Sequence, residues 1–124
     1  MSSNLYVPTR CHIFPLDLNH TALVAIDLQK DFCDVNGFCG DSLGLDLSPV
    51  RAIIPRVQNV IDWARKQGIW VIYTIESHKS DRSDVNPSKQ LRYENAGYPI
   101  GAVGKMGRFL IQGDRGNILI EELQ

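Results

Sequence analysis

The chain has 124 residues, which is enough for one domain with a hydrophobic core and too few for two. Apolar residues make up 44% of it and charged residues 22%, so the composition is that of a globular protein rather than a disordered or fibrous one. The formal net charge is −1 and the basic residues are spread among acids, so we expect no nucleic-acid partner. No apolar stretch approaches the ~20 residues of a membrane helix, so we expect no membrane either.

The N-terminal segment predicts an arm rather than a leader sequence. Residues 1–20 lack the basic start and apolar run of a secretory signal, and they contain two prolines and little periodicity, so we expect an arm that lies over the domain. The cysteines are Cys11, Cys33 and Cys39, an odd number with no Cys-x-x-Cys pair. A cytoplasmic protein with reduced thiols fits these features best.

Residues 21–75 predict a strand, a helix and a second strand. The run TALVAI at 21–26 is continuously apolar, which is typical of a strand buried on both faces of a parallel sheet. After a glycine-containing loop, Ser48-Pro49 predicts a helix start with Ser48 as N-cap, and apolar residues recur every three or four positions until Gly68 ends the helix. Pro55 predicts a slight kink or a later helix start. Residues 69–75 are the second apolar strand, so both strands should be parallel and central.

The remainder of the chain predicts less regular structure. Residues 76–90 are polar and predict a loop, and residues 96–107 are rich in glycine and irregular. The segment RFLIQG at 108–113 is a candidate short strand, and NILIEEL at 117–123 begins like a helix. The fold class is therefore α/β, with a central parallel sheet.

Three polar side chains follow the two predicted strands at the same edge of the sheet. Asp27 ends the first strand, and Glu76 and His78 follow the second. Ligands of parallel α/β sheets bind beyond the carboxyl ends of the strands, so these side chains could share a pocket. Asp27 could equally cap the loop that follows it by accepting backbone N–H bonds. Spacing alone leaves both interpretations open.

Familiar catalytic motifs are absent around Asp27. An aspartyl phosphoryl-transfer enzyme would carry a second acid two residues on, where this chain has Gln29. No G-x-G-x-x-G turn or P-loop follows the strand. A zinc hydrolase would need a recognisable ligand cluster, and Glu76 and His78 with Asp27 form only a thin candidate. We expect no cofactor.

Four segments in order resemble the isochorismatase-like cysteine hydrolases. They are TALVAIDLQKDF at 21–32, the glycine-containing loop, IPRVQNVIDWARKQGIWVIYTIESH at 54–78, and GKMGRFLIQGDRGNILIEEL at 104–123. Within that superfamily, the ESHKSDRSD and MGRFLIQGDRG segments are most similar to the biuret hydrolase and N-carbamoylsarcosine amidase branch. The resemblance implies a three-layer Rossmann-like sandwich that is incomplete here, with residues 21–124 as the N-terminal half of the domain.

The resemblance also implies a reaction. Such enzymes cleave a C–N bond of a small amide or ureide with an Asp-Lys-Cys triad, in which the Asp takes the thiol proton and the thiolate attacks the carbonyl. Asp27 matches the triad Asp. The family's Lys follows a third strand and its Cys starts a helix after a fourth, and no residue of this chain matches either one. We therefore expect a C-terminal half, or another chain, to supply both residues, and an assembled homo-oligomer.

Further roles follow from the same resemblance. Phe32 is expected to line the pocket or the core, and Glu76, His78 and Arg108 to contact a ureido or carboxylate group of the substrate. The nicotinamidase branch binds a metal through an Asp-x-His pattern after the first loop, which this chain lacks, so we expect no metal. Two alternatives stay open: an inactive isochorismatase-like half domain that acts as a binding or assembly module, and a metal-dependent hydrolase.

Overall fold

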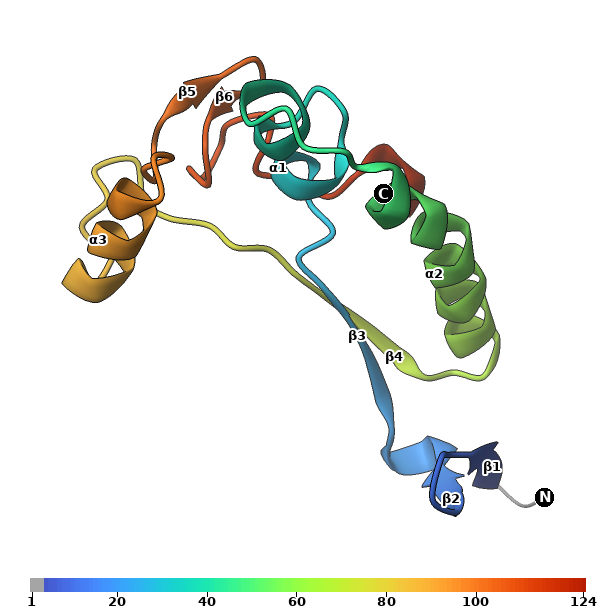
Figure 1. Ribbon diagram of the computed structural model, residues 1–124. Helices are drawn as coiled ribbons and strands as arrows, with labels where there is room; N and C mark the ends of the chain where they lie inside the picture. Colours follow the sequence, from blue (N-terminus) through green and yellow to red (C-terminus); the bar gives the residue numbers. More distant parts are fainter. Residues whose placement is uncertain (1–3) are drawn as a thin grey trace.

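The computed structural model describes residues 4–124, and they form a mixed α/β fold built around a short parallel sheet (Figure 1). In chain order the elements are β1 (Asn4–Pro8), β2 (Ile13–Asp17), the 3₁₀ turn η1 (Leu18–His20), β3 (Ala22–Ile26), α1 (Lys30–Cys33), the π-helical turn η2 (Phe38–Ser42), α2 (Ser48–Lys66), β4 (Trp70–Thr74), α3 (Pro87–Asn95), β5 (Val103–Gly104), β6 (Gly107–Arg108) and the 3₁₀ turn η3 (Glu121–Leu123). Within the described residues, no helix is long and apolar enough to cross a membrane.

The predicted strand, helix and strand unit is confirmed. Strands β3 and β4 pair in parallel, with Ala22 opposite Trp70 and Ile26 opposite Thr74. Helix α2 connects them, with Pro49 in its first turn, and Gly68 follows its end with a φ of +73° that a glycine adopts without strain. Ser48 does not cap the helix, because its hydroxyl donates to Asp46 Oδ1 at 2.7 Å.

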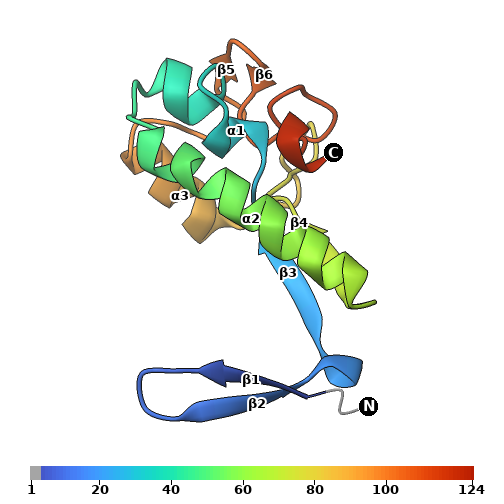
Figure 2. The same ribbon diagram turned by 90° about the vertical axis from the view of Figure 1, so that its right-hand side faces the viewer.

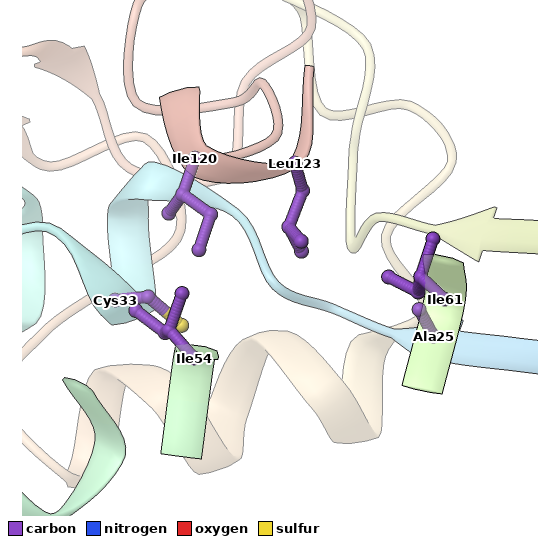
Figure 3. Packing of buried hydrophobic residues seen from close by; sticks show 6 residues of the cluster. All are labelled: Ala25, Cys33, Ile54, Ile61, Ile120 and Leu123. Atoms are coloured by element: carbon purple, nitrogen blue, oxygen red, sulfur yellow. The ribbon is translucent and has the colours of Figure 1, made fainter. Parts of the chain in front are cut away.

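Helix α2 covers one face of the sheet with its apolar stripe. Ile54 and Ile61 of α2 pack with Ala25 of β3, and Cys33, Ile120 and Leu123 close the same cluster (Figure 3). The C-terminal turn η3 therefore packs against helix α2 in the cluster that also contains Ala25 of β3. The helix starts at Ser48 and not at Pro55, and it runs through Pro55 without a break although this proline has no N–H to donate to the carbonyl four residues earlier.

A second core cluster lies beyond the carboxyl ends of the strands. It is built from Phe38, Val85, Ile100, Phe109, Leu110 and Ile111. The predicted strand at 108–113 is wrong beyond its first residue: Arg108 ends the two-residue strand β6, whereas residues 109–113 form turns with a single bridge between Ile111 and His78. Phe109, Leu110 and Ile111 are nevertheless deeply buried, so the apolar run that suggested a strand fills the core instead. The predicted helix at 117–123 is limited to the turn η3.

Helix α3 corrects the prediction that residues 76–90 form only a loop. Asn86 caps this helix by accepting a hydrogen bond from the Lys89 backbone N–H at 2.8 Å, and Pro87 occupies its first position. The Asn-Pro pair carries the same start signal that located α2. It was obscured because the residues after it are polar and provide no apolar stripe.

The N-terminal residues form a hairpin rather than an irregular arm. Strands β1 and β2 pair antiparallel, with Asn4 opposite Asp17 and Pro8 opposite Ile13. The hairpin extends away from the helices in both views of the molecule, rather than lying over them (Figure 2). Residues 1–3 of the predicted arm lie outside the described residues.

The sheet is buried on one face only, which differs from the prediction of two strands buried on both faces. The side chains of Val24, Ile26, Trp70 and Ile72 are exposed on the face away from α2, and Trp70 keeps 78% and Ile26 68% of their surface in contact with solvent. The physical reason is that residues 4–124 provide one crossover helix and two strands, whereas a parallel sheet needs a layer on each face. The fold is an incomplete α/β sandwich.

Candidate functional site

Asp27 stands where strand β3 stops. Its φ of +54° lies in the left-handed region, so the chain turns sharply there instead of continuing the strand. Its backbone N–H donates to the Thr74 carbonyl at 3.0 Å, and the Thr74 hydroxyl donates to Asp27 Oδ1 at 2.7 Å. Within residues 4–124 the Asp27 carboxylate accepts no hydrogen bond from the following loop. The neighbouring strand, rather than a capped loop, therefore holds this carboxylate.

Gln29 extends the pairing of the two strands beyond Asp27. Its side-chain oxygen accepts the Glu76 backbone N–H at 2.7 Å, and its Nε2 donates to the Glu76 carbonyl at 3.0 Å. The side chain is fully buried. One amide thus replaces the two backbone bonds that a continuing strand would have made, and it fixes the segment after β4 against the segment after β3.

Asp31 joins the loop near residue 110, which is distant in the chain, to the Gln29 side chain. It is 2% exposed, accepts the Leu110 backbone N–H at 3.2 Å and Gln29 Nε2 at 3.3 Å, and its own backbone N–H donates to the Gly116 carbonyl. Burial raises the pKa of its carboxyl above the usual range, an effect larger than the opposing hydrogen bonds. Asp31 therefore holds the loop near residue 110 rather than capping the loop that directly follows it.

Asn117 completes this buried polar group. Its Nδ2 donates to the Glu76 carbonyl at 2.7 Å, and its Oδ1 accepts the Ser77 hydroxyl at 2.5 Å. Among the described residues, Gln29, Asp31 and Asn117 are the buried polar side chains, and two of them meet at the Glu76 backbone. Sequence reasoning missed Gln29 and Asn117 as parts of the site. The alternation Asp-x-Gln-x-Asp after a buried strand was the available signal for Gln29.

Glu76 and His78 follow the end of β4, and their side chains contact helix α3. The Glu76 carboxylate forms an ion pair with Lys89 through Oε1, and the same oxygen accepts the Tyr93 hydroxyl at 3.2 Å. His78 Nε2 lies 2.9 Å from Lys89 Nζ. Burial, followed by the nearby Glu76 charge, raises the pKa of Tyr93 to about 12, so its hydroxyl stays protonated at neutral pH. Both predicted residues thus belong to one cluster with α3.

Phe32 and Arg108 are placed differently. Phe32 packs against both core clusters and meets Phe109 edge to face, with ring centroids 6.1 Å apart. Arg108 donates through Nε to Asp114 Oδ2 at 3.1 Å and through Nη1 to the Ser80 hydroxyl at 3.0 Å. The Arg108 backbone N–H donates to Asp114 Oδ2 at 2.7 Å, and this bond, followed by the bond from the Arg108 side chain, holds the pKa of the Asp114 carboxyl below its usual range. Arg108 is therefore engaged with its own loop and with the loop that carries Ser80.

The thiols of the chain are poor candidates for a nucleophile near Asp27. Cys11 lies exposed in the hairpin. Burial raises the pKa of Cys33 and of Cys39, which disfavours the reactive thiolate. Within residues 4–124, no group of three or more His, Cys, Asp or Glu side chains is arranged to hold a metal ion.

Comparison with known proteins decides the family. The isochorismatase domain model matches residues 21–124 of the chain. The chain belongs to the isochorismatase family. The segments that carried the resemblance lie within this match, and the parallel sheet and helix α2 are consistent with an incomplete fold of this kind.

Curated relatives of the chain include amidohydrolases and one protein named as inactive. Ureidoacrylate amidohydrolase RutB of Caulobacter segnis is 33% identical over 67 residues, covering 54% of this chain and 28% of RutB. RutB of Rhizobium rhizogenes is 29% identical over 72 residues, covering 58% of this chain and 29% of that protein. A probable inactive nicotinamidase of Arabidopsis thaliana is 30% identical over 96 residues, covering 76% of this chain and 45% of the relative.

These matches span less than half the length of each curated relative.

Proposed function

We propose that the chain is the N-terminal half of a cysteine amidohydrolase that cleaves a C–N bond of a small amide or ureide, such as a biuret-like or N-carbamoyl compound. The proposal rests on the Asp27 carboxylate. Asp27 lies at the sharp turn where β3 ends, the Thr74 hydroxyl donates to its carboxylate, and the chain belongs to this family. A fixed carboxylate at the end of a strand is well placed to take a proton from a thiol.

The reaction requires two groups besides Asp27. A thiol gives its proton to the Asp27 carboxylate, the thiolate attacks the amide carbonyl, and an amine or ammonia leaves before water releases the acyl group. A lysine ammonium keeps the thiolate stable. Lys105 bonds Asn36 at 3.0 Å and Lys30 bonds Glu121 at 3.0 Å, so both are committed elsewhere. We assign the triad Lys and Cys to a C-terminal half or to another chain.

The bare parts of the sheet are where such a partner would pack. The exposed face carries Val24, Ile26, Trp70 and Ile72, and an apolar groove beside β3 is lined by Ile26, Leu28, Ile53, Val57 and Val60 among others. Exposed strands that bear a continuous apolar surface aggregate unless they are covered. We propose a complete parallel sheet in the assembled protein, and a homo-oligomeric, cytoplasmic enzyme.

The proposed substrate class follows from the RutB relatives, which are named as ureidoacrylate amidohydrolases. Glu76 supplies an acceptor and Arg108 a donor for a ureido or carboxylate group, His78 supports Glu76 through the Lys89 that both contact, and Phe32 supplies an apolar wall. We propose no nucleic-acid or membrane partner. We also propose no metal or cofactor, because amide hydrolysis by a thiolate needs neither.

The test is Asp27→Asn in the complete protein, with Asp62→Asn as the matched control. Asp62 is an exposed acid on α2, so its change should leave turnover within twofold of the wild type. Ammonia release from biuret and from N-carbamoylglycine should fall by about 10³-fold or more in Asp27→Asn, because a positioned base contributes about 10²–10⁴-fold. Retention of a tenth of the activity by Asp27→Asn would contradict the role.

The second candidate is an inactive half domain that acts as a binding or assembly module, and the probable inactive nicotinamidase relative favours it. Purified residues 1–124 separate the two candidates. Turnover by these residues alone would refute the proposed triad. Inactivity alone with activity after mixing with a half that bears the Lys and Cys supports the enzyme, and inactivity in both states supports the module.

A further inference from the structure

Lys89 of helix α3 lies between the two polar residues that follow strand β4. Its ammonium forms an ion pair with Glu76 Oε1 and lies 2.9 Å from His78 Nε2. The three side chains keep only 22%, 21% and 10% of their surface exposed for Lys89, Glu76 and His78. The cluster is therefore shielded from water, unlike the ion pairs on the outer surface of the molecule.

The Lys89 contact fixes the state of the imidazole. An ammonium has three N–H donors and no acceptor, so we assign His78 Nε2 as the acceptor and Nδ1 as the nitrogen that carries the ring proton. Nδ1 is buried, makes no hydrogen bond within residues 4–124, and faces Asp84 Oδ1 at 3.5 Å. The Asp84 carboxylate favours a proton on that side of the ring. Lys89 and Asp84 together thus select one tautomer.

The same contact fixes the Glu76 carboxylate. Lys89 and Tyr93 both bind Oε1, whereas Oε2 makes no hydrogen bond within the described residues. The Glu76 backbone is clamped by Gln29 and Asn117, so the residue is held at both ends. Oε2 is left as an acceptor of fixed direction whose negative charge is offset by the ammonium beside it. Such an oxygen suits a neutral N–H donor better than a second cationic one, because the charge of the carboxylate is already offset.

We propose that Lys89 is a positioning residue that presents Glu76 Oε2 to an N–H group of an uncharged amide or ureide end of the substrate. The inference rests on the proposed function and names the substrate group that this part of the site takes. Lys89 itself does not touch the substrate. Tyr93 helps to hold the Glu76 carboxylate, because its protonated hydroxyl donates to Glu76 Oε1.

The experiment compares Lys89→Met with Lys79→Met in the complete protein. Lys79 has an exposed side chain in the same segment and bonds Asp84 through its backbone N–H, so it is a matched control. With biuret as the probe, Lys89→Met should raise KM at least tenfold and lower kcat less than threefold. Lys79→Met should change neither constant by more than twofold, and Lys89→Arg should restore much of the binding.

Nitrogen NMR of the His78 ring supplies a readout that does not depend on turnover. The wild type should show a protonated Nδ1 and an unprotonated Nε2, and Lys89→Met should lose this preference. A wild-type ring with its proton on Nε2 would overturn the inference even if Lys89→Met fails to fold. A KM within twofold of the wild type in folded Lys89→Met would also overturn it.

Asp27→Asn, measured in parallel, keeps the two proposals distinct. Hydrolysis that depends on Asp27 but is indifferent to Lys89 refutes the positioning role alone. Hydrolysis that is indifferent to Asp27 refutes the proposed function, and the assignment of a substrate group to Glu76 falls with it.

Discussion

Gly116 lies against the buried carboxylate of Asp31, and Gly116→Ala tests how rigid that contact is. A methyl group on Gly116 would stand 2.9 Å from Asp31 Cγ and closer still to Oδ1, so the carboxylate would have to move. Asp31 cannot move without losing its bonds to the Leu110 N–H and to Gln29. Leaving buried polar groups unpaired costs about 1–3 kcal/mol each, so we expect a loss of about 2–4 kcal/mol in the free energy of unfolding.

A double-mutant cycle shows whether the clash with Asp31 is the cause. In an Asp31→Ala background the obstructing carboxylate is absent, and Gly116→Ala should be neutral or stabilise by up to about 1 kcal/mol, because alanine restricts the unfolded chain. Gly113→Ala is the control. Its φ of +88° makes alanine strained, but nothing lies within 4 Å of the added methyl group, so its cost should be equal in both backgrounds.

The assay is equilibrium unfolding in guanidinium chloride, followed by tryptophan fluorescence. The coupling energy between Gly116 and Asp31 should be about 2–4 kcal/mol, and that between Gly113 and Asp31 close to zero. A Gly116→Ala protein within 0.5 kcal/mol (roughly the error of such a comparison) of the wild type would refute the reasoning. Equal costs of Gly116→Ala with and without Asp31 would refute it as well.

Three further changes test the rest of the site. Gln29→Met removes both bonds to the Glu76 backbone while keeping the side-chain volume, so unfolding should become easier by about 2–4 kcal/mol in the same assay; a change below about 1 kcal/mol would contradict the clamp. Thr74→Val removes the donor to Asp27 and should lower kcat for biuret about tenfold with little change in stability, whereas an unaltered kcat would show that the hydroxyl does not position the carboxylate. Asp31→Asn tests the raised pKa of Asp31. Because that pKa is higher in the folded protein than the unfolded value of 3.8, the wild type should lose stability relative to Asp31→Asn as the pH rises from below 3.8 through the folded pKa; a difference that is constant from pH 3 to 7 would contradict this.

Local sequence patterns determined the framework of this protein. The apolar runs that became β3 and β4, and the spacing of three and four in α2, are periodic signals that depend on neighbours in the chain. The place of Asp27 after the first strand followed from the same pattern. The family resemblance also rested on such contiguous segments, which is why the sequence was sufficient to recognise it.

Only the tertiary structure decided how the site is joined. The run at 108–113 has the composition of a strand, but residues 109–113 form turns, because the backbone of this segment bonds to His78 and to Asp31 across a long sequence separation. Gln29, Asn117 and Lys89 became part of the site because segments distant in the chain meet at Glu76. Such partners leave no periodic trace, since a hydrogen bond between remote segments depends on where the whole chain brings them and not on the residues beside each one.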